Sequence, residues 1–158
     1  MGVDEPPAYK PRKPNPLLLD PVFYFRVTAW VLGLVTLLGI ISTSLNYSGK
    51  PQDQFLSFGG NALQFTWTHN ILHVVLAGAA VLFGYGGFHP TLVKRMAIVF
   101  GSVYLVLGVL GFFVLEMGDF AIGRYPEDMG VLALTWTLNV VHILLGAWAL
   151  AAGLLSND

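Results

Sequence analysis

Four long apolar stretches follow one another along the chain and are separated by shorter polar connections. They cover residues 22–43, 62–84, 96–115 and 131–155. Each supplies the roughly 20 helical residues that cross a bilayer core of about 30 Å. The pattern predicts an all-α membrane protein with four transmembrane helices, in which residues 21–155 form a single domain.

Composition favours this membrane protein over a soluble bundle with a buried core. Of the 158 residues, 55% are hydrophobic and only 11% are charged, and the mean hydropathy is +0.67. Soluble domains carry about 25% charged residues. The net charge of −1 does not favour nucleic acid as a partner. The chain has no cysteine, which excludes disulfides, thiolate zinc sites and iron–sulfur clusters.

The basic residues favour one orientation in the membrane. Lys50 and Arg124 lie in the two connections on one side. The other six basic residues lie on the opposite side, and they are Lys10, Arg12, Lys13, Arg26, Lys94 and Arg95. By the positive-inside rule this excess predicts that both termini are cytoplasmic. In this interpretation Lys94 and Arg95 belong to the second connection, before the third helix.

A register shift of 69 residues relates the two halves of the chain. TWTHNILH at 66–73 returns as TWTLNVVH at 135–142, and the same shift aligns prolines, arginines and several glycines without a gap. Each half contains two helices, so the copies have the same topology and a pseudo-two-fold axis along the membrane normal. We predict a tandem 2+2 parallel repeat, with repeat 1 at about 21–85 and repeat 2 at about 90–154.

Polar and small residues recur at helical spacing on the second and fourth predicted helices, so that each helix carries one stripe of them. The stripes consist of Thr66, Asn70, His73, Ala77, Ala80 and Gly84, and of Thr135, Asn139, His142, Gly146, Ala149 and Gly153. Small residues let transmembrane helices approach closely, and Thr, Asn and His can hydrogen-bond between them. This predicts a helix-packing seam between the second and fourth helices, across the pseudo-two-fold axis.

Three histidines, His69, His73 and His142, are candidate cofactor ligands. Ionisable residues deep in a membrane are often functional, and imidazole is an axial ligand for haem b and suits a chlorophyll-type pigment. The small residues oppose a macrocycle between His73 and His142, because they predict helices that lie too close together. His69, which is Leu138 in the second copy, would hold a pigment on an outer face. A protein without any cofactor is the alternative, and the sequence predicts neither a metal site nor catalytic residues.

Three blocks of sequence carry a family resemblance. KRMAIVFGSVYLVLGVLGFF (94–113) and NVVHILLGAWALAAG (139–153), together with NILHVVLAGAAVLFG (70–84), resemble the small four-helix prokaryotic membrane proteins grouped as domain of unknown function 4383. The family pattern is matched at Arg95, Gly108, Asn139 and His142 and at their counterparts in the first half, except that Ala77 replaces a glycine. The resemblance covers residues 21–155. It implies a four-helix protein of the prokaryotic plasma (inner) membrane, and no activity.

The proline-rich segment 1–20 is predicted to be a cytoplasmic tail. An extended, proline-rich segment gives up few conformations when it binds a protein surface, so Lys10, Arg12 and Lys13 are candidate partner-docking residues. Attraction of these charges to anionic lipid headgroups is the alternative.

We therefore expect a non-catalytic accessory subunit of a larger photosynthetic or respiratory membrane complex. Its partners would be other integral membrane subunits, with pigment or lipid in its grooves. Two alternatives stay open. One is a b-type haem or chlorophyll-binding protein that uses the histidines of the stripe, and the other is a small transporter or channel with the polar stripe as its solute path.

Overall fold

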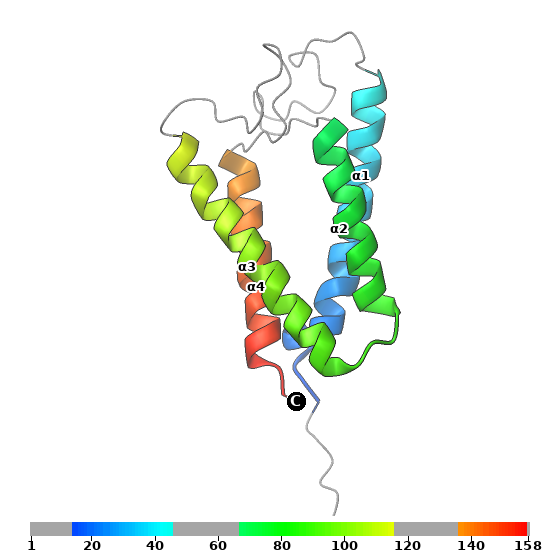
Figure 1. Cartoon of the computed structure of the whole chain (residues 1–158), viewed down its shortest axis with the longest axis vertical. Helices are drawn as coiled ribbons and strands as arrows, with labels where there is room; N and C mark the ends of the chain where they lie inside the picture. The colour runs from blue at the N-terminus through cyan, green and yellow to red at the C-terminus, as the bar shows by residue number, and fades with distance from the viewer. Residues whose placement is uncertain (1–13, 46–66, 116–135, 158) are drawn as a thin grey trace, which may run out of the picture.

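The chain forms an all-α structure. The computed structural model describes residues 14–45, 67–115 and 136–157, and these ranges are mainly helical (Figure 1). The elements are a short 3-10 helix η1 (Leu17–Leu19) and the α-helices α1 (Pro21–Leu45), α2 (Trp67–Tyr85), α3 (Pro90–Leu115) and α4 (Trp136–Leu155). The predicted fold class is confirmed as all-α, with four α-helices in the described residues.

The helix α3 begins earlier than the apolar pattern predicts, at Pro90 instead of Met96. Proline is favoured in the first turn of a helix, because the N–H groups there have no partner within the helix and proline has no N–H to satisfy. The His89 carbonyl accepts hydrogen bonds from the backbone N–H groups of Leu92 (2.9 Å) and Val93 (3.2 Å), which starts the helix. Lys94 therefore lies inside α3, with Arg95 beside it. Their assignment to the second connection is wrong because two charges interrupt the apolar pattern without interrupting the helix.

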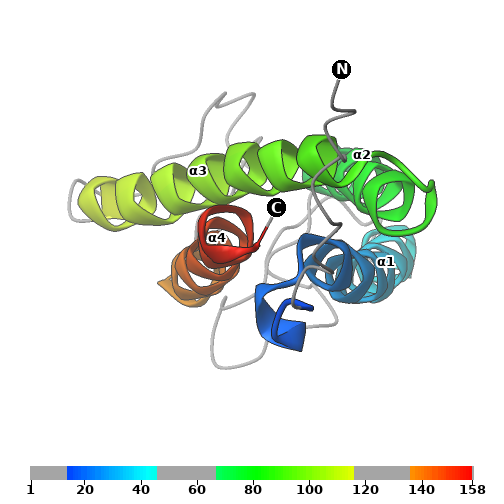
Figure 2. The same ribbon diagram turned by 90° about the horizontal axis from the view of Figure 1, so that it is seen from below.

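The helices are arranged as two hairpins. α1 packs along α2 and α3 packs along α4, and contacts of α1 with α3 and α4 join the two pairs. Figure 1 shows that the pairs meet near the chain termini and diverge toward the other end, and Figure 2 shows them from below. The starts of α1 and α3 are 69 residues apart, as are those of α2 and α4.

Glycines bring the helix backbones into direct contact inside each hairpin. A Cβ added at Gly146 of α4 would lie 2.6 Å from the backbone nitrogen of Leu105, and one at Gly101 of α3 would lie 2.7 Å from that of Leu150. A Cβ at Gly84 of α2 would lie 3.0 Å from the backbone nitrogen of Arg26 in α1. Such close approach strengthens packing between transmembrane helices.

These glycines have different partners from those we predicted. The seam was expected to join the second and fourth helices, but Gly84 faces α1, and Gly146 and Gly153 face α3. The spacing of small residues marks a closely packed face of a helix, but it does not identify the helix that packs there. Each helix packs on its neighbour in the same half of the chain, α1 on α2 and α3 on α4, and these pairings cover Gly84, Gly146 and Gly153.

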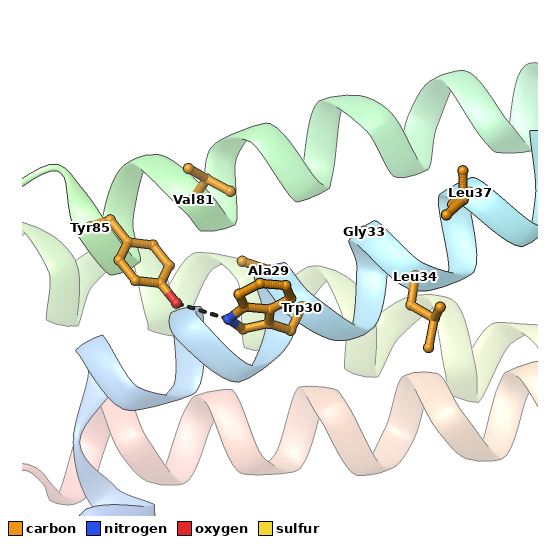
Figure 3. A pocket seen from close by; sticks show the side chains of 7 residues that line it. All are labelled: Ala29, Trp30, Gly33, Leu34, Leu37, Val81 and Tyr85. Atoms are coloured by element: carbon orange, nitrogen blue, oxygen red, sulfur yellow. Dashed lines mark hydrogen bonds between the residues drawn. The ribbon is translucent and has the colours of Figure 1, made fainter.

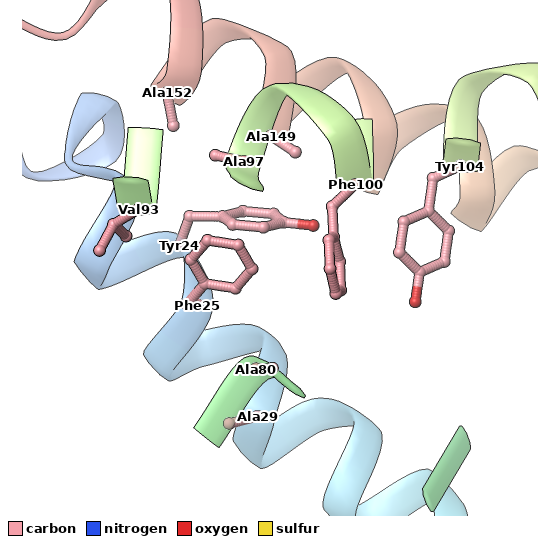
Figure 4. Packing of buried hydrophobic residues seen from close by; sticks show 10 residues of the cluster. All are labelled: Tyr24, Phe25, Ala29, Ala80, Val93, Ala97, Phe100, Tyr104, Ala149 and Ala152. Atoms are coloured by element: carbon pink, nitrogen blue, oxygen red, sulfur yellow. The ribbon is translucent and has the colours of Figure 1, made fainter. Parts of the chain in front are cut away.

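A cluster of aromatic residues joins the hairpins near the termini. Tyr24 of α1 packs edge-to-face on Trp148 of α4, with ring centroids 5.2 Å apart. Phe25 contacts Phe83 of α2 and Phe100 of α3, each at 5.3 Å. Figure 4 shows Tyr24 beside the alanines of α3 and α4, whose small side chains leave room for its ring.

Basic side chains of the first helix in each hairpin bind the end of the second. Arg26 Nε donates a hydrogen bond of 2.9 Å to the carbonyl oxygen of Gly84, in the last turn of α2. Lys94 Nζ donates one of 3.1 Å to the carbonyl oxygen of Ser156, after α4. Carbonyl groups at a helix C-terminus carry partial negative charge and lack intrahelical partners. These contacts therefore satisfy the helix ends and fix the register of each hairpin.

The final part of the predicted tail lies against α4. Trp148 Nε1 donates a hydrogen bond of 2.8 Å to the carbonyl oxygen of Leu18, and the backbone N–H of Asn157 donates one of 2.6 Å to Asn15 Oδ1. Residues 14–20 are thus held by the chain itself. Lys10, Arg12 and Lys13 lie outside the described residues.

The outward faces of the helices are apolar. The segments Pro21–Ile41 and Pro90–Gly111 are long and apolar enough to cross a membrane, yet only 39% and 33% of their most apolar windows are buried. Trp30 is 75% exposed and Leu144 is 65% exposed. A soluble protein rarely leaves so continuous an apolar surface in water, which favours a membrane protein. The apolar segments of the other two helices within the described residues are shorter, Asn70–Tyr85 and Asn139–Leu155.

The glycine contacts predict opposite effects for two alanine substitutions. Gly146→Ala should lower the free energy of unfolding in detergent by about 1–3 kcal/mol, because its methyl group overlaps the α3 backbone. The control Gly78→Ala, on α2, meets nothing within 4 Å and should be neutral or stabilise by up to about 1 kcal/mol. Chemical unfolding followed by circular dichroism measures both variants. Equal stabilities would contradict the packing of α4 on α3.

Candidate functional site

The predicted stripes form the buried faces of α2 and α4. Thr66, Thr135 and the side chain of His69 lie outside the described residues. Ala77 is half-buried, and the remaining members are buried, namely Asn70, His73, Ala80, Gly84, Asn139, His142, Gly146, Ala149 and Gly153. Along each helix the polar members come first and the small members lie toward the end at which the hairpins meet.

Asn139 of α4 is packed closely against α3. Its side-chain amide fills the space that a Cβ at Gly111 of α3 would take. Its backbone carbonyl oxygen lies 2.8 Å from the position of a Cβ added at Gly108. The residue is fully buried, and neither amide atom has a hydrogen-bond partner among the described residues. A buried amide without partners costs about 1–3 kcal/mol. Asn139 therefore lowers the stability of the bundle unless a group outside the described chain binds it.

The His142 ring lies against an aromatic residue of the neighbouring helix. The ring centroids of His142 and Tyr104 are 5.5 Å apart with the planes tilted by 37°, and both side chains are buried. Tyr104 in turn lies 6.4 Å from Phe100, so His142 is connected to the aromatic cluster through α3. His73 is similarly buried on α2, at 8% exposure.

Tyr104 is absent from the predicted site although the sequence contains a signal for it. Gly101, Tyr104, Gly108 and Gly111 recur at intervals of three and four, so they share one face of α3. That face packs on α4, which places Tyr104 beside His142. Among the described residues no group of three or more His, Cys, Asp and Glu side chains could hold a metal ion.

Comparison with protein families concerns the second hairpin. Residues 94–157 match the family described as domain of unknown function, DUF4383. This part of the chain is similar to DUF4383. The match includes Arg95, Gly108, Asn139 and His142, on which the predicted resemblance depends, and it confirms that resemblance for α3 and α4. No curated protein and no solved structure matches the chain.

The contact of Asn139 with Gly111 predicts a coupled pair of substitutions. Gly111→Ala should destabilise the protein by about 1–3 kcal/mol, since its methyl group overlaps the Asn139 amide. In an Asn139→Ala background the same substitution should cost much less, because the overlapping atoms are gone. Unfolding free energies of the two single variants and the double variant give the coupling. Additive effects would show that the two side chains do not meet.

Proposed function

We propose that the protein is a non-catalytic accessory subunit of a larger membrane-embedded complex. In this proposal all four helices cross the plasma (inner) membrane of a prokaryote and both termini are cytoplasmic. The proposal rests on the contacts that the polar side chains make. The polar side chains with a defined contact bind helix ends or neighbouring helices, while the outward faces of the helices are apolar.

Several contacts support a structural use of the polar groups. Arg26 and Lys94 bind helix ends. Trp148 holds the segment before α1, and His142 stacks on Tyr104. Catalysis in a membrane needs ionisable groups free to exchange protons or bind substrate. These side chains instead have partners that stabilise the bundle.

The register shift supports the proposed topology. Equivalent helices in the two halves start 69 residues apart and pair in the same way within their hairpins. A gene duplication that repeats two helices gives both halves the same direction across the membrane. Within the described residues Arg26, Lys94 and Arg95 lie near the starts of α1 and α3, at the end where the hairpins meet, which supports a cytoplasmic location for that end.

Partners would be other integral membrane subunits, in contact with the apolar outer faces. Interfaces between transmembrane proteins need no exposed charges, because both sides replace lipid contacts. The segment with Lys10, Arg12 and Lys13 would add a cytoplasmic contact with such a subunit.

A deletion tests membership in a complex. Removing residues 2–13 keeps Asn15 and Leu18, which bind α4, so the melting temperature in detergent should not change. Recovery with co-purifying subunits in mild detergent should fall. A second variant keeps the full length but replaces Lys10, Arg12 and Lys13 by Gln. It separates the contribution of the three charges to recovery from the contribution of the rest of residues 2–13. A protein that purifies alone in wild-type form contradicts the proposal.

A second candidate is a b-type haem or chlorophyll-binding protein. One observation favours it, since the small residues of α2 and α4 pack on α1 and α3 and do not force α2 and α4 together. The geometric objection to a macrocycle between His73 and His142 therefore no longer applies. The absorption spectrum of the purified protein tests this candidate. A Soret band that disappears in both His73→Ala and His142→Ala would support it, and a colourless wild-type protein would contradict it.

A further inference from the structure

The outer face of the α1–α2 hairpin contains an apolar groove. Its volume is about 420 Å3, and Gly33, Leu34 and Leu37 of α1 and Val81 of α2 line it (Figure 3). Gly33 is exposed, and a Cβ there would meet nothing within 4 Å, so the missing side chain opens the groove. Small-molecule sites have volumes of about 300–1,000 Å3. The groove is large enough to hold a narrow apolar chain.

One end of the groove is polar. Trp30 Nε1 donates a hydrogen bond of 3.0 Å to the Tyr85 hydroxyl oxygen, which leaves the hydroxyl hydrogen available to another acceptor. The Arg26 guanidinium lies 5.2 Å from the centre of the Tyr85 ring. Arg26 is exposed, and no carboxylate pairs with it among the described residues. Its Nε binds Gly84, so its terminal nitrogens can donate to an anion.

The polar end lies where a lipid headgroup would be. Arg26 is in the second turn of α1, and Trp and Tyr side chains are typical of the membrane–water interface. From Trp30 to Leu37 the groove follows α1 for about 10 Å at 1.5 Å per residue, away from the chain termini. Apolar surface, aromatic side chains and a cation thus follow one another in the order of an acyl chain, a glycerol backbone and a phosphate.

We propose that this groove binds an anionic phospholipid. One acyl chain lies along Gly33, Leu34 and Leu37, the Tyr85 hydroxyl donates to an ester or phosphate oxygen, and Arg26 pairs with the phosphate. The proposal rests on the membrane location proposed above but not on membership in a complex. Lipid titration of the purified protein needs no partner subunit, so the two proposals fail separately.

The second hairpin supplies an internal comparison. At the shift of 69 residues Arg95 corresponds to Arg26 and is also exposed. The other groove positions differ, because Val99 replaces Trp30, Ser102 replaces Gly33 and Leu154 replaces Tyr85. A cation at this register is therefore common to both halves, whereas the glycine that opens the groove and the Trp–Tyr pair at its end occur at these positions only in the first half.

Filling the groove tests the acyl-chain contact. Gly33→Leu extends a side chain into the groove from an exposed position where an added Cβ meets nothing within 4 Å, so the fold should be retained. The matched control is Gly78→Leu on α2, where a Cβ also meets nothing within 4 Å and which does not line the groove. Delipidated full-length protein is titrated with phosphatidylglycerol and with phosphatidylcholine of the same acyl chains, and bound lipid is counted by native mass spectrometry. Gly33→Leu should weaken binding of both lipids at least about tenfold, since several CH2 contacts are lost. Gly78→Leu should bind both lipids as the wild type does.

The charge contact is tested with the two arginines. The wild type should prefer phosphatidylglycerol by about fivefold, as expected for one basic residue at the headgroup level. Arg26→Gln should remove the preference by weakening phosphatidylglycerol binding more than phosphatidylcholine binding, and Arg95→Gln should keep the preference. Arg26→Lys retains the charge but lacks the Nε that binds the Gly84 carbonyl oxygen. It should keep most of the preference for phosphatidylglycerol.

Three results would overturn the proposal. They are wild-type binding without a preference for the anionic lipid, undiminished binding by Gly33→Leu, and an equal loss of preference in Arg26→Gln and Arg95→Gln. The first is also the result expected if a helix of another subunit or of a second copy occupies the groove.

Discussion

Direct contact between helix backbones at glycine positions determines how the rest of this bundle is built. Gly101 and Gly146 bring α3 and α4 together, and Gly84 does the same for α2 and α1. Because these faces are used inside the hairpins, a different kind of contact has to join the two hairpins. The rings of Tyr24 and Phe25 provide it by packing on α4 and α3. The remaining helix faces need only be apolar.

The sequence was sufficient to predict which residues are buried but not which helix covers them. The interval of three or four residues places Asn139, His142 and Gly146 on one face, and that face is buried. The partner of a face depends on how helices pair in space, which the interval does not encode. The start of α3 is missed for a similar reason, since Lys94 interrupts the apolar pattern but binds the end of α4 from within the helix. The groove depends on Trp30 and Tyr85, which are far apart in sequence and meet through the hairpin.

The two halves share a backbone plan and differ in their surfaces. Their helices start at matching positions, and in both hairpins a basic side chain binds a backbone carbonyl at the C-terminal end of the second helix. That side chain is Arg26 in one half and Lys94 in the other, and these two positions are not related by the shift of 69 residues. Both halves therefore satisfy a helix end with a basic side chain, but from different positions. Residues 94–157, which match DUF4383, contain the pair α3 and α4. The glycines of this pair lie closer to the partner helix than Gly84 of α2 lies to α1.

The division into hairpins has a consequence for the order of folding. Contacts within a hairpin join helices that are neighbours in the chain, so each hairpin can form as soon as its second helix has been synthesised. Trp148 contacts both Tyr24 and Leu18, and these contacts span most of the chain. They cannot form until α4 is in place. The segment before α1 therefore remains unattached during most of synthesis, and its docking on α4 marks completion of the bundle.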